Sequence, residues 1–154
     1  MQITTTRFGN IDVNNESIIH MDETMLGFEH CNRYVLLQDR PDTAFKWMQS
    51  IDDPTVAFLV INPNDFFPDY EIELTDEQAE SLKLSDAHDS VMFTTVTLDR
   101  KSNRATTNLV GPIVMNVQTM HASQIVLQND RYTTKQTIWE RSQSCTDREL
   151  VKAA

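Results

Sequence analysis

The sequence predicts an all-β fold, a single antiparallel β-barrel-like domain with one or two short helices. About nine or ten short runs are rich in β-branched and aromatic residues, and turn-forming residues separate them. The intervals between these runs leave little room for the helical crossovers that a parallel sheet requires. The length of 154 residues is that of one domain, and the chain contains no internal repeat or low-complexity linker.

The first part of the chain is expected to consist of strands. Residues 2–8 and 11–13 flank Gly9-Asn10, a pair typical of tight turns, and together they predict a hairpin. Residues 56–61 are continuously apolar between two prolines, which is typical of a strand covered on both faces. Three further strands are expected at residues 17–21, 33–38 and 44–49.

The second part combines strands with a short helix. Residues 70–74 alternate between apolar and acidic side chains, which predicts a strand. Thr75 and Gln78 form a capping-box pattern that predicts a helix at 75–82. Further strands are expected at residues 90–98, 113–117 and 124–127. We divide the chain into a barrel domain at 1–136 and a C-terminal extension at 137–154, which is either helical or disordered.

The net charge of −10 is concentrated in one segment. Residues 52–89 hold eleven acidic residues and one base, Lys83, whereas the rest of the chain holds twelve acids and twelve bases. One interpretation is that these charges only keep a small protein soluble. The other, which the order of the charges favours, is a neutral body with one strongly negative side that meets a positive partner.

The composition argues against several classes of protein. Net acidity is unfavourable for direct nucleic-acid binding, which depends on neutralising phosphates. The longest apolar run, at 56–61, is too short to span a bilayer, and the first residues lack a secretory signal. Cys31 and Cys145 show no motif spacing, so we expect free thiols in a cytoplasmic protein that does not act at a membrane.

No catalytic, cofactor or metal site is expected, and we predict that the protein is not an enzyme. Three glycines are too few for a phosphate-binding loop. The four histidines lack zinc-ligand spacing, and the neighbours His30 and Cys31 are expected to point apart on a strand. Asp52 and Asp53 precede a proline, so we interpret them as turn residues that bond nearby backbone rather than as paired catalytic carboxylates.

A turn between the apolar run and the acidic strand holds two adjacent phenylalanines, Phe66 and Phe67. Either they close one end of the barrel, or they form an apolar anchor surrounded by acids, which is the usual anatomy of a protein-binding spot. The carboxylates that follow also protect a sheet edge against aggregation.

Eight segments carry a resemblance to a known family. They are RFG at 7–9, GFE at 27–29, RYVLL at 33–37, FKWMQSIDDPTVAFLVINP at 45–63, FFPDYEIEL at 66–74, TTNLVGPIVMN at 106–116, QIVL at 124–127 and RYTTKQ at 131–136. In this order and spacing they resemble the family of the flagellar assembly factor FliW. The resemblance extends over about residues 1–138, and the longer extension after Ile138 departs from the family pattern.

The resemblance implies a cytoplasmic bacterial binding protein with a β-barrel-like fold. It implies that the chain binds the RNA-binding translational repressor CsrA and so relieves repression of flagellin synthesis, and that cytoplasmic flagellin competes for the chain. Two alternatives stay open. One is a dedicated flagellin-binding chaperone without a role toward CsrA. The other is a small β-barrel flavin enzyme, which the acidity and the missing phosphate loop disfavour.

The expected partner-binding residues come from the segment around FFPDYE and from the segment around NLVGP. They are Asp65, Phe66, Phe67, Asp69, Tyr70, Glu71, Glu73, Asn108, Leu109, Val110, Pro112 and Met115. For Leu109 and Met115, packing in the core is the favoured interpretation. The sequence assigns neither segment to a particular partner.

Overall fold

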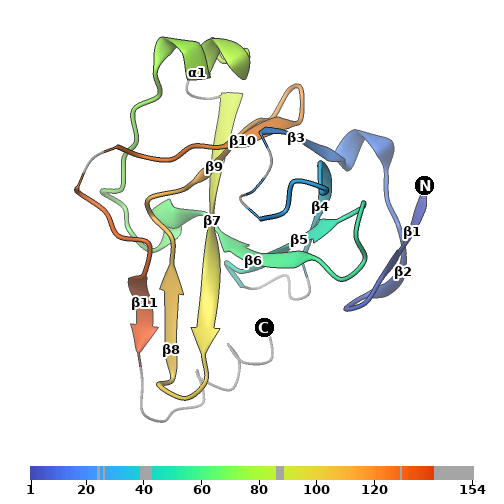
Figure 1. Cartoon of the computed structure of the whole chain (residues 1–154), viewed down its shortest axis with the longest axis horizontal. Coiled ribbons are helices and arrows are strands. Elements are labelled where there is room, and N and C mark those ends of the chain that lie inside the picture. The colour runs from blue at the N-terminus through green and yellow to red at the C-terminus, as the bar shows by residue number, and fades with distance from the viewer. Residues whose placement is uncertain (24, 26, 39–42, 86–88, 129, 141–154) are drawn as a thin grey trace.

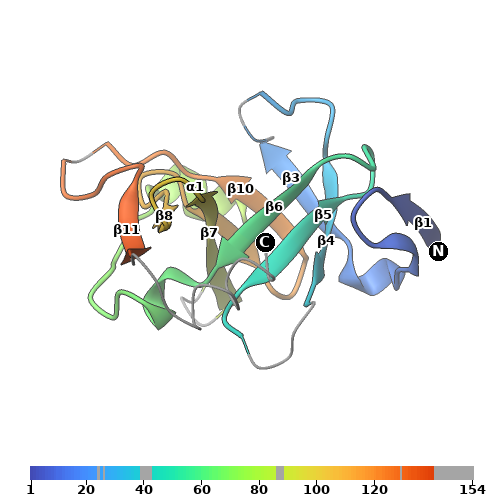
Figure 2. The ribbon, with the colours of Figure 1, turned by 90° about the horizontal axis from the view of Figure 1, so that it is seen from below.

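Seven strands close a barrel in the computed structural model, which describes residues 1–23, 25, 27–38, 43–85, 89–128 and 130–140 (Figures 1 and 2). The barrel strands are β3 (Ile19–Glu23), β4 (Arg33–Leu37), β5 (Lys46–Ser50), β6 (Ala57–Ile61), β7 (Ser90–Asp99), β9 (Ile113–Asn116) and β10 (His121–Gln124). Neighbouring strands pair antiparallel, except β10 and β3, which run parallel. The predicted all-β, barrel-like fold is confirmed.

Strand β7 belongs to two sheets. Its first half pairs with β9 and its middle with β6, which closes the barrel. Its last four residues pair instead with β8 (Arg104–Thr107), and β8 pairs with β11 (Gln136–Glu140). The three strands form an arm that extends away from the barrel in Figure 1.

The N-terminal hairpin forms as predicted, but its turn lies elsewhere. Strand β1 (Gln2–Thr5) pairs with β2 (Gly9–Asp12), so the turn is at residues 6–8 and Gly9 begins the second strand. The Thr5 hydroxyl stabilises this turn because it accepts the Phe8 N–H at 2.8 Å and donates to the Gly9 carbonyl at 2.9 Å. Gly9 has φ +70°, a conformation that favours glycine.

The predicted two-sided burial of the apolar run is confirmed for its second half, since Leu59, Val60 and Ile61 of β6 are buried, whereas residues 56–58 are half-buried. The main core fills the barrel between strands distant in sequence. Its buried members are Ile19, Met21, Met25, Cys31, Tyr34, Met48, Val60, Phe93, Ile113, Met115 and Ala122.

The predicted helix is also confirmed as α1 (Asp76–Ser81), with Thr75 as its N-cap. The Thr75 hydroxyl accepts the Gln78 N–H at 3.1 Å, and the Gln78 side chain accepts the Thr75 N–H at 2.9 Å, which completes the capping box. Two 3₁₀ turns, η1 (Asn15–Ser17) and η2 (Pro63–Asp65), also lie in the part of the chain that the structure describes. No helix in the described ranges is long and apolar enough to cross a membrane.

The strand expected at 70–74 does not form. Its alternation is real, because Tyr70 is buried, Ile72 and Leu74 are half-buried, and the glutamates between them are exposed. The segment has no strand partner, however, and instead packs on a small cluster around Leu82, Val114 and Ile125. Alternation of apolar and polar residues therefore indicates that one side of the segment is buried, but it does not show that the segment is hydrogen-bonded to a neighbouring strand.

Strand assignments near the C-terminus also differ from expectation. Strand β10 ends at Gln124, where the strand at 124–127 was expected to begin, and β8 was not predicted. Residues 137–140 lie in β11, not in a helix or coil. The remainder of the expected extension, residues 141–154, lies outside the described residues, and the domain division stays a prediction.

Candidate functional site

The two segments expected to bind partners are joined by one buried tyrosine. The Tyr70 hydroxyl donates to the Leu109 carbonyl at 2.7 Å, and the Tyr70 ring meets the Tyr132 ring edge-on at 4.6 Å. The Tyr132 hydroxyl accepts the Glu71 N–H and donates to the Glu71 carbonyl, both at 3.2 Å. The Leu109 N–H donates to the Thr133 carbonyl at 3.1 Å. Burial, and next the neighbouring Tyr132, raises the pKa of Tyr70, so its hydroxyl is a donor.

The twelve expected residues divide by exposure. The four carboxylates Asp65, Asp69, Glu71 and Glu73 are exposed. Four residues are half-buried, namely Phe66, Phe67, Asn108 and Val110. Four are buried, namely Tyr70, Leu109, Pro112 and Met115. Leu109 and Met115 are therefore packed in the core. Tyr70 and Pro112 are also buried and lie beneath the exposed and half-buried residues of the expected partner-binding set.

The turn that carries the two phenylalanines is fixed by hydrogen bonds. The Phe67 N–H donates to the Pro63 carbonyl at 2.8 Å, and the Asn64 side-chain amide donates to the Tyr70 carbonyl at 3.0 Å. The Phe66 ring lies 5.8 Å from the Phe45 ring. Each phenylalanine is thus held partly inward and leaves part of its ring accessible.

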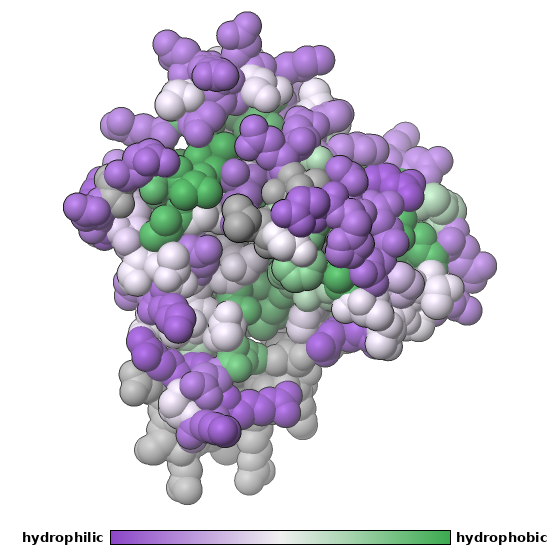
Figure 3. All heavy atoms as spheres, viewed as in Figure 1, coloured by the Kyte–Doolittle hydropathy of each residue, from purple (hydrophilic) through white to green (hydrophobic). Residues whose placement is uncertain are grey.

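A groove borders the acidic side chains. The groove is partly apolar and partly polar and has a volume of about 460 Å³. Ile72, Ile125, Val126 and Leu127 supply its apolar lining, and Glu71, Glu73, Gln128 and Arg131 are among its polar residues. Val126 is 55% exposed and adds apolar surface to this groove. Figure 3 shows apolar atoms below α1 with hydrophilic side chains around them. A second cavity of about 640 Å³ shares Glu71 and Ile72. The arrangement combines apolar contact area with negative charge.

The acids of residues 52–89 do not all lie on one side, which corrects the expectation from the charge count. Asp52 and Asp53 lie in the β5–β6 turn beside Arg33 and His30, whereas α1 lies at another end of the molecule (Figures 1 and 2). The negative surface is narrower and comprises seven acids without a base in residues 65–80. We call residues 65–80 the acidic segment.

A family model described as FliW protein matches residues 2–138. The chain belongs to the FliW family. A flagellar assembly factor FliW of Geobacter sulfurreducens is 40% identical over 142 residues, which cover 92% of this chain and 89% of that one. Another, from Caldanaerobacter subterraneus subsp. tengcongensis, is 38% identical over 91% of this chain and 94% of its own.

A crystal structure of the flagellar assembly factor FliW has the same fold. It matches with a TM-score of 0.84 at 31% identity, and the match covers 93% of this chain and 100% of that one. The barrel described above is therefore the FliW barrel.

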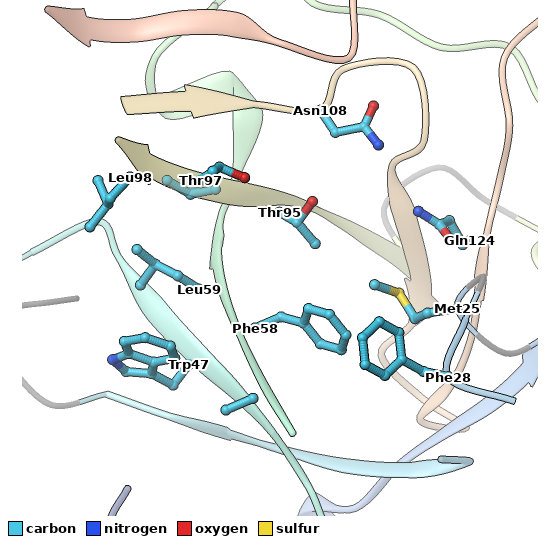
Figure 4. Close-up of a pocket in the computed structure, with 12 residues that line it drawn as sticks. Met25, Phe28, Trp47, Phe58, Leu59, Thr95, Thr97, Leu98, Asn108 and Gln124 are labelled. Carbon is cyan, nitrogen blue, oxygen red and sulfur yellow. The ribbon is translucent and has the colours of Figure 1, made fainter. Parts of the chain in front are cut away.

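An apolar cleft on this FliW barrel was not predicted from the sequence. It has a volume of about 510 Å³, and Phe28, Trp47, Phe58 and Leu59 line its apolar side (Figure 4). The Phe28 and Phe58 rings meet edge-on at 5.0 Å. Asn108 is the one expected partner-binding residue that lines it. The sequence offers little indication of this cleft, because Phe28, Trp47 and Phe58 are distant in sequence and come together only in the folded barrel.

The turn interpretation of Asp52 and Asp53 is partly confirmed. Asp53 Oδ1 accepts the Thr55 N–H at 3.0 Å and the Thr55 hydroxyl at 2.7 Å, within one turn. Bonds from Thr55 and from His30 lower the pKa of Asp53 to about 2. Asp52, in contrast, accepts the backbone N–H groups of Asn32 and Arg33 at the start of the neighbouring strand β4.

The expected divergence of His30 and Cys31 is wrong. His30 lies in a turn and not on a strand, and Cys31 follows it immediately before β4. His30 Nε2 lies 2.9 Å from Asp53 Oδ2, and the Cys31 sulfur lies within 4.8 Å of both ligand atoms. The two side chains still differ in burial, because Cys31 is fully buried in the barrel core and His30 is exposed, but their ligand atoms come within 4.8 Å of each other.

Proposed function

We propose that this chain is a flagellar assembly factor that binds the translational repressor CsrA, relieves its repression of flagellin synthesis, and releases it when cytoplasmic flagellin competes. It is a regulator of translation and flagellum biogenesis that acts by protein binding in the cytoplasm, without catalysis, a cofactor, or contact with RNA or a membrane. The observation that carries the proposal is the acidic segment, held against residues 108–110 by Tyr70 and bordered by a groove with a mixed apolar and polar lining.

The charge of the acidic segment supports binding to an RNA-binding protein. Such a protein needs a positive surface to hold phosphates, and seven carboxylates without an intervening base are complementary to that surface. A docked acidic protein also repels an RNA backbone, so it weakens RNA binding even where it does not cover the RNA site.

The apolar surfaces support binding to flagellin. Flagellin before export exposes amphipathic terminal segments, and such segments bind as helices in apolar grooves. The cleft that contains Phe28 and Phe58 supplies such a lining, and the exposed Thr97 lies on its wall. Competition between the two partners requires that their sites overlap or that one bound partner excludes the other.

Size-exclusion chromatography of purified proteins tests the proposal directly. The chain mixed with CsrA is expected to elute as a complex at low and moderate salt, and added flagellin is expected to release CsrA. The absence of any complex with either partner contradicts the proposal. A complex with flagellin but none with CsrA replaces it with the chaperone alternative.

Charge reversal locates the CsrA surface. Asp69→Lys, Glu71→Lys and Glu73→Lys together are expected to weaken CsrA binding by at least about tenfold, because they replace attraction by repulsion. The matched control reverses Asp12, Glu16 and Glu29, which are also exposed and lie outside the acidic segment, and changes the net charge equally. Equal effects of the two triple variants refute the assignment to the acidic segment. Thr97→Arg is expected to weaken flagellin binding selectively.

A further inference from the structure

Three potential metal ligands converge where the turn before β4 meets the β5–β6 turn. His30 Nε2 and Asp53 Oδ2 lie 2.9 Å apart, and the Cys31 sulfur lies within 4.8 Å of both. No other three His, Cys, Asp or Glu side chains converge in this way within the described part of the chain. We propose that His30, Cys31 and Asp53 form a zinc-binding site.

The donor set is the one that zinc prefers. An imidazole nitrogen, a thiolate and a carboxylate oxygen are all ordinary zinc ligands, and three protein ligands leave a fourth position for water or a partner's side chain. The charges also balance, because a thiolate and a carboxylate together neutralise a divalent cation. A hard ion such as magnesium or calcium prefers oxygen ligands, and the thiol disfavours it.

The separations suit a tetrahedral ion. Zinc bonds of about 2.0–2.3 Å place ligand atoms roughly 3.3–3.8 Å apart. The histidine and aspartate atoms are slightly closer than this, and the sulfur lies at most roughly 1–1.5 Å beyond the expected separation. Cys31 is fully buried, whereas His30 is 58% exposed, so the His30 and Asp53 side chains would have to rotate toward the sulfur for all three to bind one ion.

Neighbouring groups already orient the ligands. Thr55 occupies Asp53 Oδ1 with two hydrogen bonds, which directs Oδ2 toward His30. The Cys31 N–H is held by the Phe28 carbonyl at 2.9 Å. Such supporting bonds are typical of metal sites, where they fix the ligand before the ion arrives.

A buried hydroxyl beside the sulfur points to the same site. Tyr34 is fully buried against Cys31, and its hydroxyl bonds no oxygen or nitrogen atom of the described residues. A buried hydroxyl without a good acceptor is unfavourable by about 1–3 kcal/mol. A metal-bound thiolate is a much stronger acceptor than a thiol, so zinc binding satisfies this hydroxyl.

Zinc at this position would affect the apolar cleft. The turn that supplies His30 and Cys31 also carries Phe28, whose ring packs on Phe58 in the cleft wall. The ion would tie this turn to the β5–β6 turn through Asp53. Partner binding in the cleft and zinc binding are then coupled through the position of Phe28.

Metal titration of the full, reduced chain tests the site without any partner. Competition with a chromophoric chelator is expected to give one zinc ion per chain. Cobalt is the spectroscopic probe, and its complex is expected to show thiolate-to-metal charge transfer and the visible bands of tetrahedral coordination. His30→Gln is expected to weaken zinc binding by about 10–100-fold, and Cys31→Ser by about 100-fold with loss of the charge-transfer band.

Two control variants separate this site from incidental binding. His121 forms a similar pair with Asp22, at 2.7 Å, but without a thiol, so His121→Gln is expected to leave zinc affinity unchanged. Cys145→Ser tests the chain's other cysteine and is also expected to have no effect. Absence of stoichiometric binding, loss of binding in Cys145→Ser, or unchanged affinity in His30→Gln overturns the proposal. His30 is exposed, so His30→Gln decides the matter even if the buried Cys31→Ser variant fails to fold.

Discussion

The Arg33 guanidinium donates two hydrogen bonds to one oxygen of Asp52, from Nη2 at 2.9 Å and from Nε at 3.1 Å. The other oxygen accepts the backbone N–H groups of Asn32 at 2.8 Å and of Arg33 at 2.9 Å. Burial alone raises the pKa of Asp52, but these four bonds outweigh it and lower that pKa. One carboxylate therefore fastens the beginning of β4 to the turn that follows β5.

Replacement of Asp52 by alanine is expected to lower the free energy of unfolding by about 2 kcal/mol, because it leaves two backbone N–H groups and a guanidinium without their acceptor. Urea denaturation of the wild type and the variant measures this difference. Asp69→Ala, at an exposed position, is the control and is expected to change stability by less than about 0.5 kcal/mol. Equal stability of the two variants contradicts the fastening role of Asp52.

Removal of the Tyr70 hydroxyl is expected to loosen the acidic segment. Tyr70→Phe keeps the buried ring but leaves the Leu109 carbonyl without its 2.7 Å hydrogen bond, so we expect a loss of about 1–2 kcal/mol in stability. Faster amide hydrogen exchange is expected in residues 65–73. Tyr132→Phe removes two longer bonds of 3.2 Å at a half-buried ring, and a smaller effect is expected. A larger loss of stability in Tyr132→Phe than in Tyr70→Phe would contradict the role assigned to the Tyr70 hydroxyl.

Local patterns predicted those features of the fold whose cause is local. The capping box at Thr75 and Gln78 and the strand in the apolar run depend on neighbours in sequence; the capping box is confirmed, and the burial of the run is confirmed for residues 59–61. The hairpin turn was misplaced because Gly-Asn is typical of tight turns, while the Thr5 hydroxyl stabilises a longer one. The strand at 70–74 was wrong because burial alternates there without a pairing partner.

The site could be predicted only as two unconnected segments. Their connection depends on the bond between Tyr70 and Leu109, which are 39 residues apart, and no local pattern encodes that bond. The convergence of His30, Cys31 and Asp53 was missed for the same reason, because it requires both the register of β4 on β5 and the turn conformation at His30. The charge count located the acidic segment but also included Asp52 and Asp53, which lie elsewhere.

The β7–β8 hairpin turn is expected to respond to acid through Asp99. Hydrogen bonds from the Ser102 side chain and from the Lys101 N–H, the latter at 3.0 Å, lower the pKa of Asp99. A carboxyl with a lowered pKa in the folded state stabilises that state above the unfolded pKa, and this contribution is lost as the pH falls through the folded pKa. Carboxyl NMR titration is expected to give Asp99 a midpoint below the ordinary aspartate value.

Ser102→Ala provides the matched test of that assignment. Since the Ser102 hydroxyl is the largest cause of the lowered pKa, its removal is expected to raise the Asp99 midpoint toward the ordinary value. The midpoint of Asp53, whose pKa is lowered by Thr55 and His30 in a different part of the chain, is expected to stay unchanged. An Asp99 midpoint that does not move in Ser102→Ala is incompatible with this hydrogen bond.

Helix α1, at the end of the acidic segment, is expected to depend on its cap. It has only six residues, too few to be stable alone, so the loss of one capping bond is significant. Thr75→Ala is expected to lower stability by about 1 kcal/mol, and Thr75→Gly by only a few tenths relative to threonine. Gln78→Ala removes the reciprocal bond to the Thr75 N–H. Because the two side chains cap each other's backbone, the double variant is expected to lose less than the sum of the single losses. Denaturation of the wild type, Thr75→Ala, Gln78→Ala and the double variant measures this coupling. Strictly additive losses would contradict a cooperative cap.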